Sequence, residues 1–269
     1  MSEPVGKAGK AALDRALEET EDLVLFYQPI HDSRTKKIYA AEALLRQRRA
    51  SGEIRSAQII TDAAEESPGP ELFHLNNVLV KQAYTEAARW PDAVRLNVNL
   101  SPREFQEGDV VPRLTELITS CGVDTTRINL EITETSYIDD PEQTMDVLEA
   151  IKECGVELWL DDFGTGHSSI THLQHFPLDG IKLPGAFMRD VLTDDRCRAI
   201  ARNLIRLAHD LGLRVIAEEV EEEAQREFLL EQGCDYIQGF LFSRPMEPDT
   251  FVKFLSAHAA TDGLPSSGE

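Results

Sequence analysis

The stretch CGVELWLDDFG, residues 154–164, gives the clearest indication of the fold in this sequence. Gly155 follows a helix-like segment, and glycine readily adopts the left-handed conformation that ends a helix. The apolar run from Val156 to Leu160 has the length and composition of a buried strand. The acidic pair Asp161-Asp162 stands where that strand ends. A helix followed by such a strand is the repeating unit of a mostly parallel α/β sheet.

The same unit recurs along the chain. Helical stretches also end at Gly122, Gly212 and Gly233, and an apolar strand follows each of them. Helices are expected between the strands, for example Pro70–Trp90, Pro141–Cys154 behind the N-cap Asp140, and Arg196–Leu211. The expected strands are Leu23–Pro29, Tyr39–Glu42, Arg95–Asn99, Ile128–Ile132, Val156–Leu160, Gly180–Lys182, Arg214–Ala217 and Tyr236–Gln238. The sequence therefore predicts an α/β fold, a TIM-like (β/α)₈ barrel.

Length and composition agree with one large domain. The chain has 269 residues, and α/β barrels of about 250 residues form a single domain. Its content of 42% hydrophobic and 28% charged residues is typical of a folded protein. We expect an N-terminal lead over residues 1–20 with a helix near Ala11–Glu19, a barrel over residues 21–260, and a disordered tail over residues 261–269.

The net charge of −21 excludes several partners. Nucleic acid polymers and anionic membranes attract basic proteins, so neither is expected to bind here. To bind an anionic substrate, the protein would need metal ions or a few basic side chains at the binding site. The four cysteines are far apart and lack the spacing of a zinc site, which predicts reduced thiols. Because no apolar run is long enough for a membrane span or a signal peptide, a cytoplasmic location is expected.

A polar residue closes nearly every expected strand. In a barrel of parallel strands the C-terminal strand ends meet at one rim, where the active site lies. For any single position, solvation of a loop explains a polar residue, but that explanation is weak for the whole set. The set comprises Glu42, Asn99, Glu131, Asp161, Lys182, Glu218 and Gln238.

These side chains offer oxygen ligands and no histidine or cysteine. Hard oxygen ligands favour Mg²⁺ or Mn²⁺ over zinc, and the set is large enough for one or two ions. Such centres activate water and stabilise the oxygens of a phosphoryl displacement. Lys182 is the cation of the set and is placed to orient water or neutralise developing charge. The expected metal ligands are Glu42, Asn99, Glu131, Asp161, Asp162 and Glu218.

The motifs around these residues, in this order, resemble the EAL family of cyclic di-GMP phosphodiesterases from about Leu23 to Pro248. They are EALLR at 42–46, NVNLSP at 97–102, LEITE at 130–134, DDFGTGHSS at 161–169, AEEVE at 217–221 and QGF at 238–240. The resemblance implies a barrel whose first strand is antiparallel to the others. The length leaves room for a single EAL domain without a sensory or GGDEF-like segment.

The resemblance also implies a reaction, which is divalent-metal-dependent hydrolysis of cyclic di-GMP to linear pGpG. The catalytic residues would be Lys182, Glu218 and Glu42, and Lys182 and Glu218 would act on the attacking water. Glu134 and Glu221 would stabilise the loop after Asp161. That loop and its helix form a candidate homodimer surface, and a regulatory protein is a further candidate partner. Contacts to the dinucleotide would come from Gln28, Leu44, Arg46, Asp162 and Gln238; Arg46 suits a phosphate because guanidinium binds it through two parallel hydrogen bonds.

Three positions depart from the family pattern. Pro184 stands where the family commonly has an aspartate after the lysine, which removes a carboxylate and a backbone donor. Glu219 replaces the glycine of AEGVE, and His167 replaces the usual tyrosine after GTG. These departures keep open an alternative in which a weak or inactive domain acts as a cyclic di-GMP receptor that signals through a protein partner. A third hypothesis is a barrel enzyme acting on another metal-chelated anion.

Overall fold

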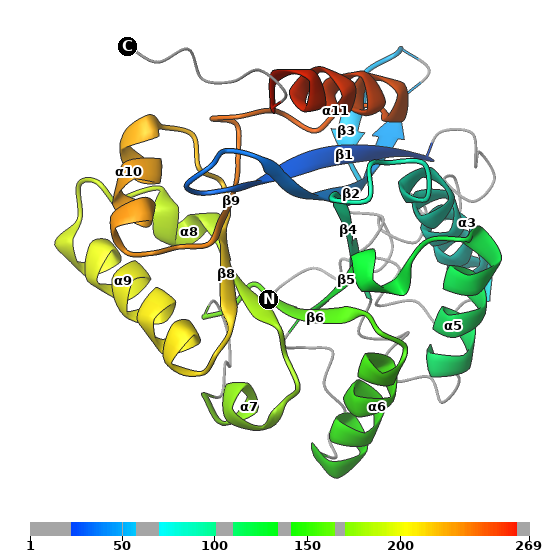
Figure 1. The fold of residues 1–269 in the computed structure, drawn as a ribbon, viewed down its shortest axis with the longest axis horizontal. Coiled ribbons are helices and arrows are strands. Elements are labelled where there is room, and N and C mark those ends of the chain that lie inside the picture. Colours follow the sequence, from blue (N-terminus) through cyan, green and yellow to red (C-terminus); the bar gives the residue numbers. More distant parts are fainter. Residues whose placement is uncertain are drawn as a thin grey trace, which may run out of the picture.

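The computed structural model describes residues 23–49, 51–57, 70–100, 110–133, 141–164 and 170–262. The expected N-terminal lead with its helix, the N-cap Asp140, Glu134 and His167 lie outside these residues. In Figure 1 the strands surround the centre of the molecule and the helices form a ring outside them.

The described strands form one sheet that closes on itself. Its order is β1-β9-β8-β7-β6-β5-β4-β2-β3, and an additional pairing of β1 with β2 completes the ring and leaves β3 outside it. The strands are β1 (Leu23–Asp32), β2 (Ile38–Arg48), β3 (Ile54–Ser56), β4 (Arg95–Asn99), β5 (Ile128–Thr133), β6 (Glu157–Asp161), β7 (Gly180–Leu183), β8 (Arg214–Ala217) and β9 (Tyr236–Gln238).

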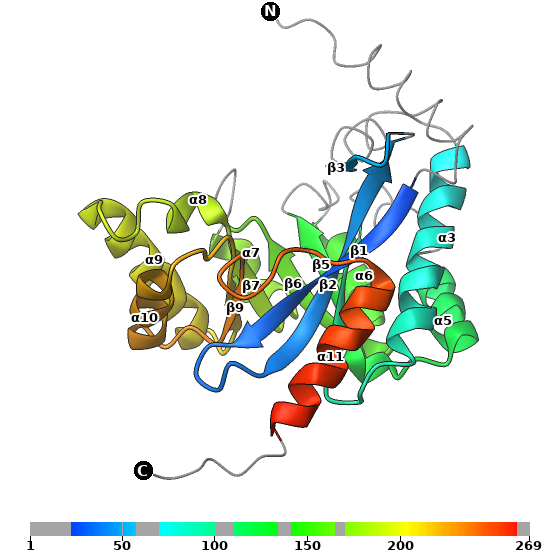
Figure 2. The same cartoon turned by 90° about the horizontal axis from the view of Figure 1, so that it is seen from above.

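Strand β1 runs antiparallel to both of its neighbours, β2 and β9. The pairs from β2 through β4 to β9 are all parallel. The expected barrel with an antiparallel first strand is therefore confirmed. Strand β3 was not expected; it pairs with Arg46–Arg48 at the C-terminal end of β2, and Figure 2 shows it at the end of the β1–β2 pair that lies opposite their turn.

The described helices agree with the sequence expectations to within a few residues. The expected helices Pro70–Trp90, Pro141–Cys154 and Arg196–Leu211 correspond to α3, α6 and α9. Helix α11 runs through Asp262, two residues into the expected tail, and the rest of that tail lies outside the described residues. The helices are α3 (Pro70–Ala87), α5 (Val110–Cys121), α6 (Pro141–Glu153), α7 (Ile170–His175), α8 (Gly185–Met188), α9 (Asp195–Asp210), α10 (Glu223–Glu231) and α11 (Pro248–Asp262).

The helix-ending role of the glycines is confirmed. Gly122, Gly155, Gly212 and Gly233 have φ angles of 69°, 89°, 76° and 81°. A side chain is disfavoured in this left-handed region, so glycine allows the chain to leave each helix without strain and enter the next strand.

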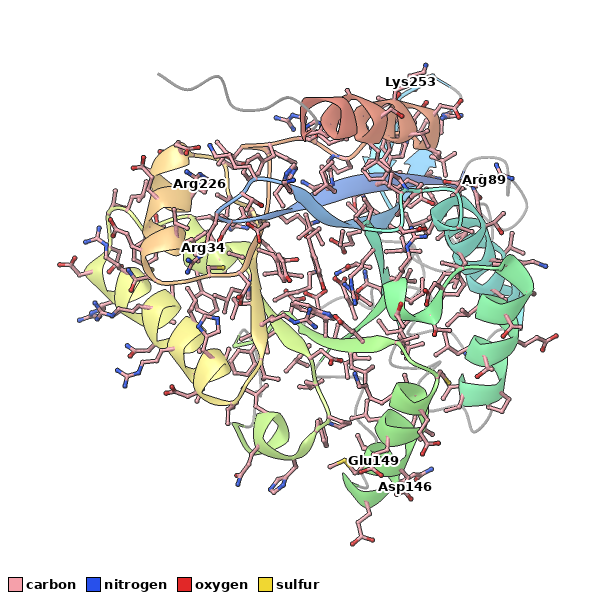
Figure 3. All side chains as sticks on the ribbon, in the orientation of Figure 1. Arg34, Arg89, Asp146, Glu149, Arg226 and Lys253 are labelled. Atoms are coloured by element: carbon pink, nitrogen blue, oxygen red, sulfur yellow. The ribbon has the colours of Figure 1, made fainter. Side chains whose placement is uncertain are left out.

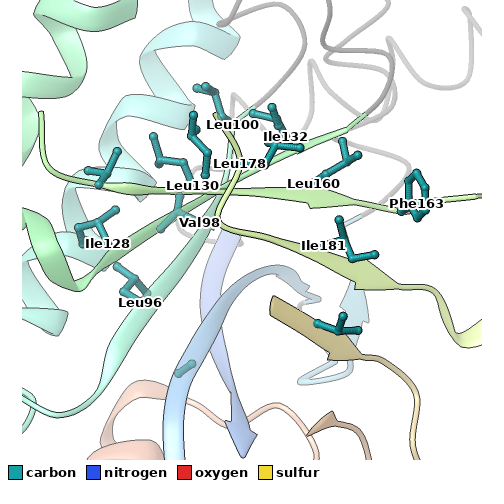
Figure 4. Packing of buried hydrophobic residues seen from close by; sticks show 14 of the residues in the cluster. Leu96, Val98, Leu100, Ile128, Leu130, Ile132, Leu160, Phe163, Leu178 and Ile181 are labelled. Carbon is teal, nitrogen blue, oxygen red and sulfur yellow. The ribbon is translucent and has the colours of Figure 1, made fainter. Parts of the chain in front are cut away.

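Alternate residues of the strands face opposite sides of the barrel wall. On β4 and β5 the outward residues Leu96, Val98, Ile128 and Leu130 belong to one large buried apolar cluster, which Figure 4 shows in close-up. The residues between them, such as Asn97 and Asn129, are polar and fully buried. The barrel wall thus packs its helices through an apolar outer face and encloses an interior that holds these buried amides together with a small apolar cluster of Ile30, Ala40, Trp159 and Ile216.

Exposed charges lie on the outer side of the helices. Figure 3 shows Asp146 and Glu149 projecting from α6 and Lys253 projecting from α11. Among the described residues, no helix is both long and apolar enough to span a bilayer.

A charged network closes the N-terminal end of the barrel. Glu157 forms an ion pair with Arg95 at 2.7 Å and another with Arg214 at 2.6 Å. The Tyr39 hydroxyl donates to Glu157 at 3.3 Å, and its ring stacks on Tyr236 at 3.8 Å between centroids. These groups join β2, β4, β6, β8 and β9 at one level, where a single carboxylate serves two guanidinium groups.

Replacing Glu157 with Ala is expected to destabilise the fold. Two partly buried guanidinium groups would lose their carboxylate, which costs about 2–3 kcal/mol of unfolding free energy. Urea denaturation measures this loss. The control is Glu53→Ala, whose pair with Arg55 is about half exposed and contributes little to stability because solvent screens it. Equal losses in the two variants would contradict a structural role for the Glu157 network.

Candidate active site

The ammonium group of Lys182 lies among four carboxylates at the opposite end of the barrel. Its Nζ atom is 2.8 Å from Glu218, 3.0 Å from Glu131, 3.3 Å from Asp161 and 3.6 Å from Glu42. The Lys182 side chain is only 1% exposed. Side chains from β2, β5, β6, β7 and the residue after β8 therefore meet at one point, as the sequence predicted.

Glu42 reaches this point from the middle of β2 rather than from its end. Strand β2 continues to Arg48, so the expectation that Glu42 ends its strand was wrong. Glu42 is, however, the last residue of β2 that pairs with β4, opposite Asn97. Beyond it, β2 leaves the barrel wall and pairs with β1 and β3. The closed part of the wall therefore ends at Glu42, which explains why it reaches the rim.

Amide side chains hold the Glu42 carboxylate from two sides. Asn99 donates to its Oε1 atom at 3.2 Å, and Gln238 donates to Oε2 at 2.7 Å. Gln238 is also 3.3 Å from Gln28, which donates to the backbone oxygen of Ser243. Of the expected substrate contacts, Gln28 and Gln238 thus lie beside the carboxylate cluster.

Asp161, Asp162 and Glu218 form a second close group, with one ligand atom of each within 4.8 Å of the others. Asp162 has a φ angle of 55°, a conformation that an aspartate tolerates better than most residues. Its backbone N–H donates to the Asp161 carboxylate at 2.9 Å. The chain therefore turns sharply after β6, with both aspartates close to Glu218.

Burial and mutual repulsion set the charge of these groups. Burial raises the pKa of Glu218 to about 8, aided by the charges of Asp161 and Glu42 and opposed by Lys182. Burial likewise raises the pKa of Glu131 well above its usual range. Burial alone would lower the pKa of Lys182, but its surrounding carboxylates outweigh burial and raise it well above the ordinary value. The Lys182 ammonium therefore keeps its positive charge.

The donor set suits hard divalent cations. Four carboxylates surround the Lys182 ammonium, and that of Asp162 lies close to Asp161 and Glu218, so these five groups carry more negative charge than Lys182 offsets when they are ionised. The donors are oxygen atoms of carboxylates and of the Asn99 amide. Oxygen donors with excess negative charge match Mg²⁺ or Mn²⁺.

Other expected site residues lie outside the group of side chains around Lys182. Leu44 and Arg46 lie on the part of β2 beyond the barrel wall, opposite Phe26 and Val24 of β1. Arg46 donates to the backbone oxygen of Leu45, and burial lowers its pKa. Glu221 is exposed in the segment after β8, and Glu134 lies outside the described residues. Their expected roles toward substrate and loop stay predictions.

The two departures from the family pattern within the described residues are neighbours in space. Pro184 precedes α8 as its N-cap. Glu219 has a φ angle of 51°, and its carboxylate accepts from Arg189 at 3.2 Å. A Cβ atom on Gly185 would lie 2.1 Å from Cδ of Glu219. The position of Glu219 therefore depends on the absence of a side chain at Gly185.

Two buried amides beneath the cluster do not belong to the site predicted from the sequence. Asn97 donates to Glu131 at 2.6 Å, and Asn129 donates to Asn97 at 2.8 Å. The sequence contains a pattern that indicates the inward position of Asn97, because polar and apolar residues alternate strictly in Arg95-Leu96-Asn97-Val98-Asn99. Such period-two alternation marks the two faces of a strand. Both amides lie within their strands, whereas the residues of the predicted metal site are expected at strand ends.

Comparison with known proteins agrees with this geometry. A family model described as the EAL domain matches residues 10–245. The signaling protein YkoW of Bacillus subtilis (strain 168) is 33% identical over 240 residues, which cover 88% of this chain and 30% of that protein. The chain thus spans less than a third of the length of that relative.

Two similar solved structures contain the dinucleotide. The PaMucR phosphodiesterase in complex with c-di-GMP has a TM-score of 0.83 and 28% identity, covering 90% of this chain and 98% of that one. The manganese and c-di-GMP complex of Klebsiella pneumoniae BlrP1 has a TM-score of 0.72 and 28% identity, and the match covers 84% of this chain and 56% of that one. With its closed barrel, its carboxylate-rich rim and a family match over most of its length, the chain belongs to the EAL domain family.

Proposed function

We propose that this protein hydrolyses cyclic di-GMP to linear pGpG with the help of Mg²⁺ or Mn²⁺. The observation that carries the proposal is the gathering of Glu42, Glu131, Asp161 and Glu218 within 3.6 Å of the Lys182 ammonium at one end of the barrel. Solved relatives named as a phosphodiesterase with c-di-GMP and as a manganese complex support the substrate and the metal.

One or two ions would be held by Glu42, Asn99, Glu131, Asp161, Asp162 and Glu218. When bound, they would lower the pKa of water and offset charge on the phosphoryl oxygens. Glu218 and Lys182, 2.8 Å apart, would act together on the attacking water, with Glu218 accepting its proton and Lys182 orienting it. Glu42 would link the ligands to the substrate side through Gln238.

The substrate would contact the rim beside these ligands. Gln28 and Gln238 supply amide groups next to Glu42, and Arg46 supplies a guanidinium suited to a phosphate. Leu44 and Asp162 would complete the contacts. Glu134 and Glu221 are proposed to stabilise the loop after Asp161. A homodimer through that loop and its helix, and a regulatory protein partner, belong to the same proposal.

A receptor function is the second candidate, and the neighbouring departures Pro184 and Glu219 favour it. Pro184 removes a carboxylate beside the cluster, while Glu219 places a new one above Gly185. A domain altered in this way would bind cyclic di-GMP and pass the signal to a protein partner without cleaving it.

Incubation of the purified protein with cyclic di-GMP and Mn²⁺ or Mg²⁺ separates the two functions. We expect pGpG to accumulate, and excess chelator to stop its formation, because the ligand cluster requires cations to bind a dianionic substrate. Chromatography of the products measures this outcome. Retained binding of cyclic di-GMP without any pGpG would reject the enzyme and support the receptor.

Glu42→Ala is expected to abolish most turnover while the protein stays folded. The substitution removes one carboxylate from the cluster and the acceptor of both Asn99 and Gln238. A loss of at least about 100-fold in kcat is consistent with the removal of a metal ligand or of a charged group in the transition state. Glu53→Ala on the exposed β3 hairpin is the matched control. Wild-type turnover by Glu42→Ala would show that this site assignment is wrong.

Lys182→Met is expected to make folding depend on divalent cations. Removing a buried ammonium leaves its carboxylates uncompensated, which costs about 3 kcal/mol in the presence of chelator. Added Mn²⁺ should then raise the melting temperature more in the variant than in the wild type, because ligands stabilise the state that binds them. Differential scanning calorimetry measures both shifts. Identical responses in the two proteins would contradict the proposed charge balance.

A further inference from the structure

A continuous line of hydrogen bonds crosses the barrel interior below the carboxylate cluster. Arg95 Nη1 donates to Asn129 Oδ1 at 2.9 Å, and Asn129 Nδ2 donates to Asn97 Oδ1 at 2.8 Å. Asn97 Nδ2 then donates to Glu131 Oε1 at 2.6 Å. Arg95 is itself paired with Glu157 at 2.7 Å. The line thus connects the charged network at the closed end with the site at the open end.

Arg95 fixes the direction of every bond in this line. A guanidinium group can only donate hydrogen bonds, so the atom of Asn129 that faces it must be the carbonyl oxygen. The NH₂ group of Asn129 then points at Asn97, which must turn its own carbonyl oxygen toward it. Asn97 is left with its NH₂ group facing Glu131. The chemistry of one arginine therefore determines which end of each amide faces the next group.

This direction assigns different roles to the two oxygens of Glu131. Oε1 accepts from Asn97, whereas Oε2 lies 3.0 Å from Nζ of Lys182 and faces the cluster. Glu131, Asn97 and Asn129 are all 0% exposed, so water does not compete for these contacts. Turning either amide around would leave two oxygen atoms facing each other at a buried position, which is strongly disfavoured.

We propose that Asn129 and Asn97 are positioning residues for the metal centre, and that they present Oε2 of Glu131 to a divalent cation. The inference rests on the proposed function, in which Glu131 is a ligand. Groups that orient a metal ligand change metal affinity without touching the ion. Asn129 lies two hydrogen bonds away from Glu131, so we expect its effect on metal binding to pass through the amide of Asn97.

Two substitutions at Asn129 test this role. In Asn129→Asp, the new carboxylate can accept from both Arg95 and Asn97 but cannot donate. Asn97 would then turn its oxygen toward Glu131. In Asn129→Leu, a side chain of similar size removes both hydrogen bonds without adding charge. Either change should shift the position of Oε2 of Glu131, while every proposed metal ligand remains present.

Tyr39→Phe is the matched control. The Tyr39 hydroxyl contacts Asn129 at 3.4 Å, Arg214 at 3.2 Å and Glu157 at 3.3 Å. Its removal perturbs the same buried network but leaves the line from Arg95 to Glu131 intact. A loss of stability that all three variants share therefore reports on packing. Only a loss of Mn²⁺ affinity that is confined to the Asn129 variants reports on the direction of the amides.

Mn²⁺ binding to each folded variant is measured by calorimetric titration without nucleotide, with melting temperature as a second readout. We expect both Asn129 variants to bind Mn²⁺ about tenfold or more weakly than the wild type, and Tyr39→Phe to retain wild-type affinity. Unchanged affinity in both Asn129 variants would overturn the inference, as would an equal loss in Tyr39→Phe or a wild type that binds no Mn²⁺. A wild type that shows the expected Mn²⁺ pattern but forms no pGpG would reject the proposed function alone.

Discussion

The ammonium of Lys182 lies where four carboxylates come within 3.6 Å of its nitrogen, at a point shielded from solvent. Burying so many acidic groups together is unfavourable without a nearby cation, because both desolvation and mutual repulsion favour their protonated forms. The position of Lys182 on β7 resolves part of this conflict in the protein itself. The remaining negative charge suits the divalent ions that the proposed reaction requires.

Closure of the barrel makes this arrangement feasible. On β4 and β5 the wall turns apolar residues outward against the helices and amide and carboxylate side chains inward, so this part of the interior holds a hydrogen-bonded network from one end to the other. Glu157 holds Arg95 and Arg214 at the closed end, and amides carry hydrogen bonds upward to Glu131. Hydrogen bonds between side chains thereby connect the two charged centres.

Pro184 and Glu219 change the surroundings of the cluster rather than its centre. Glu219 adopts a left-handed backbone conformation, contacts Arg189 and occupies the space that a side chain at Gly185 would need. The three residues thus form one local adjustment between α8 and the segment after β8. This adjustment leaves the ion pairs of Lys182 with its four carboxylates in place.

The sequence by itself determined the barrel, the glycines that end the helices and most of the carboxylates, because these depend on local periodicity and on the rule that parallel strand ends meet at one rim. It did not determine that Glu42 lies in mid-strand, since the point where β2 leaves the wall depends on pairing with β4 and β1. It also did not show the line from Arg95 through Asn129 and Asn97, or the contact of Glu219 with Gly185. Those contacts join residues on different strands and loops, so only the register and closure of the tertiary structure could bring them together.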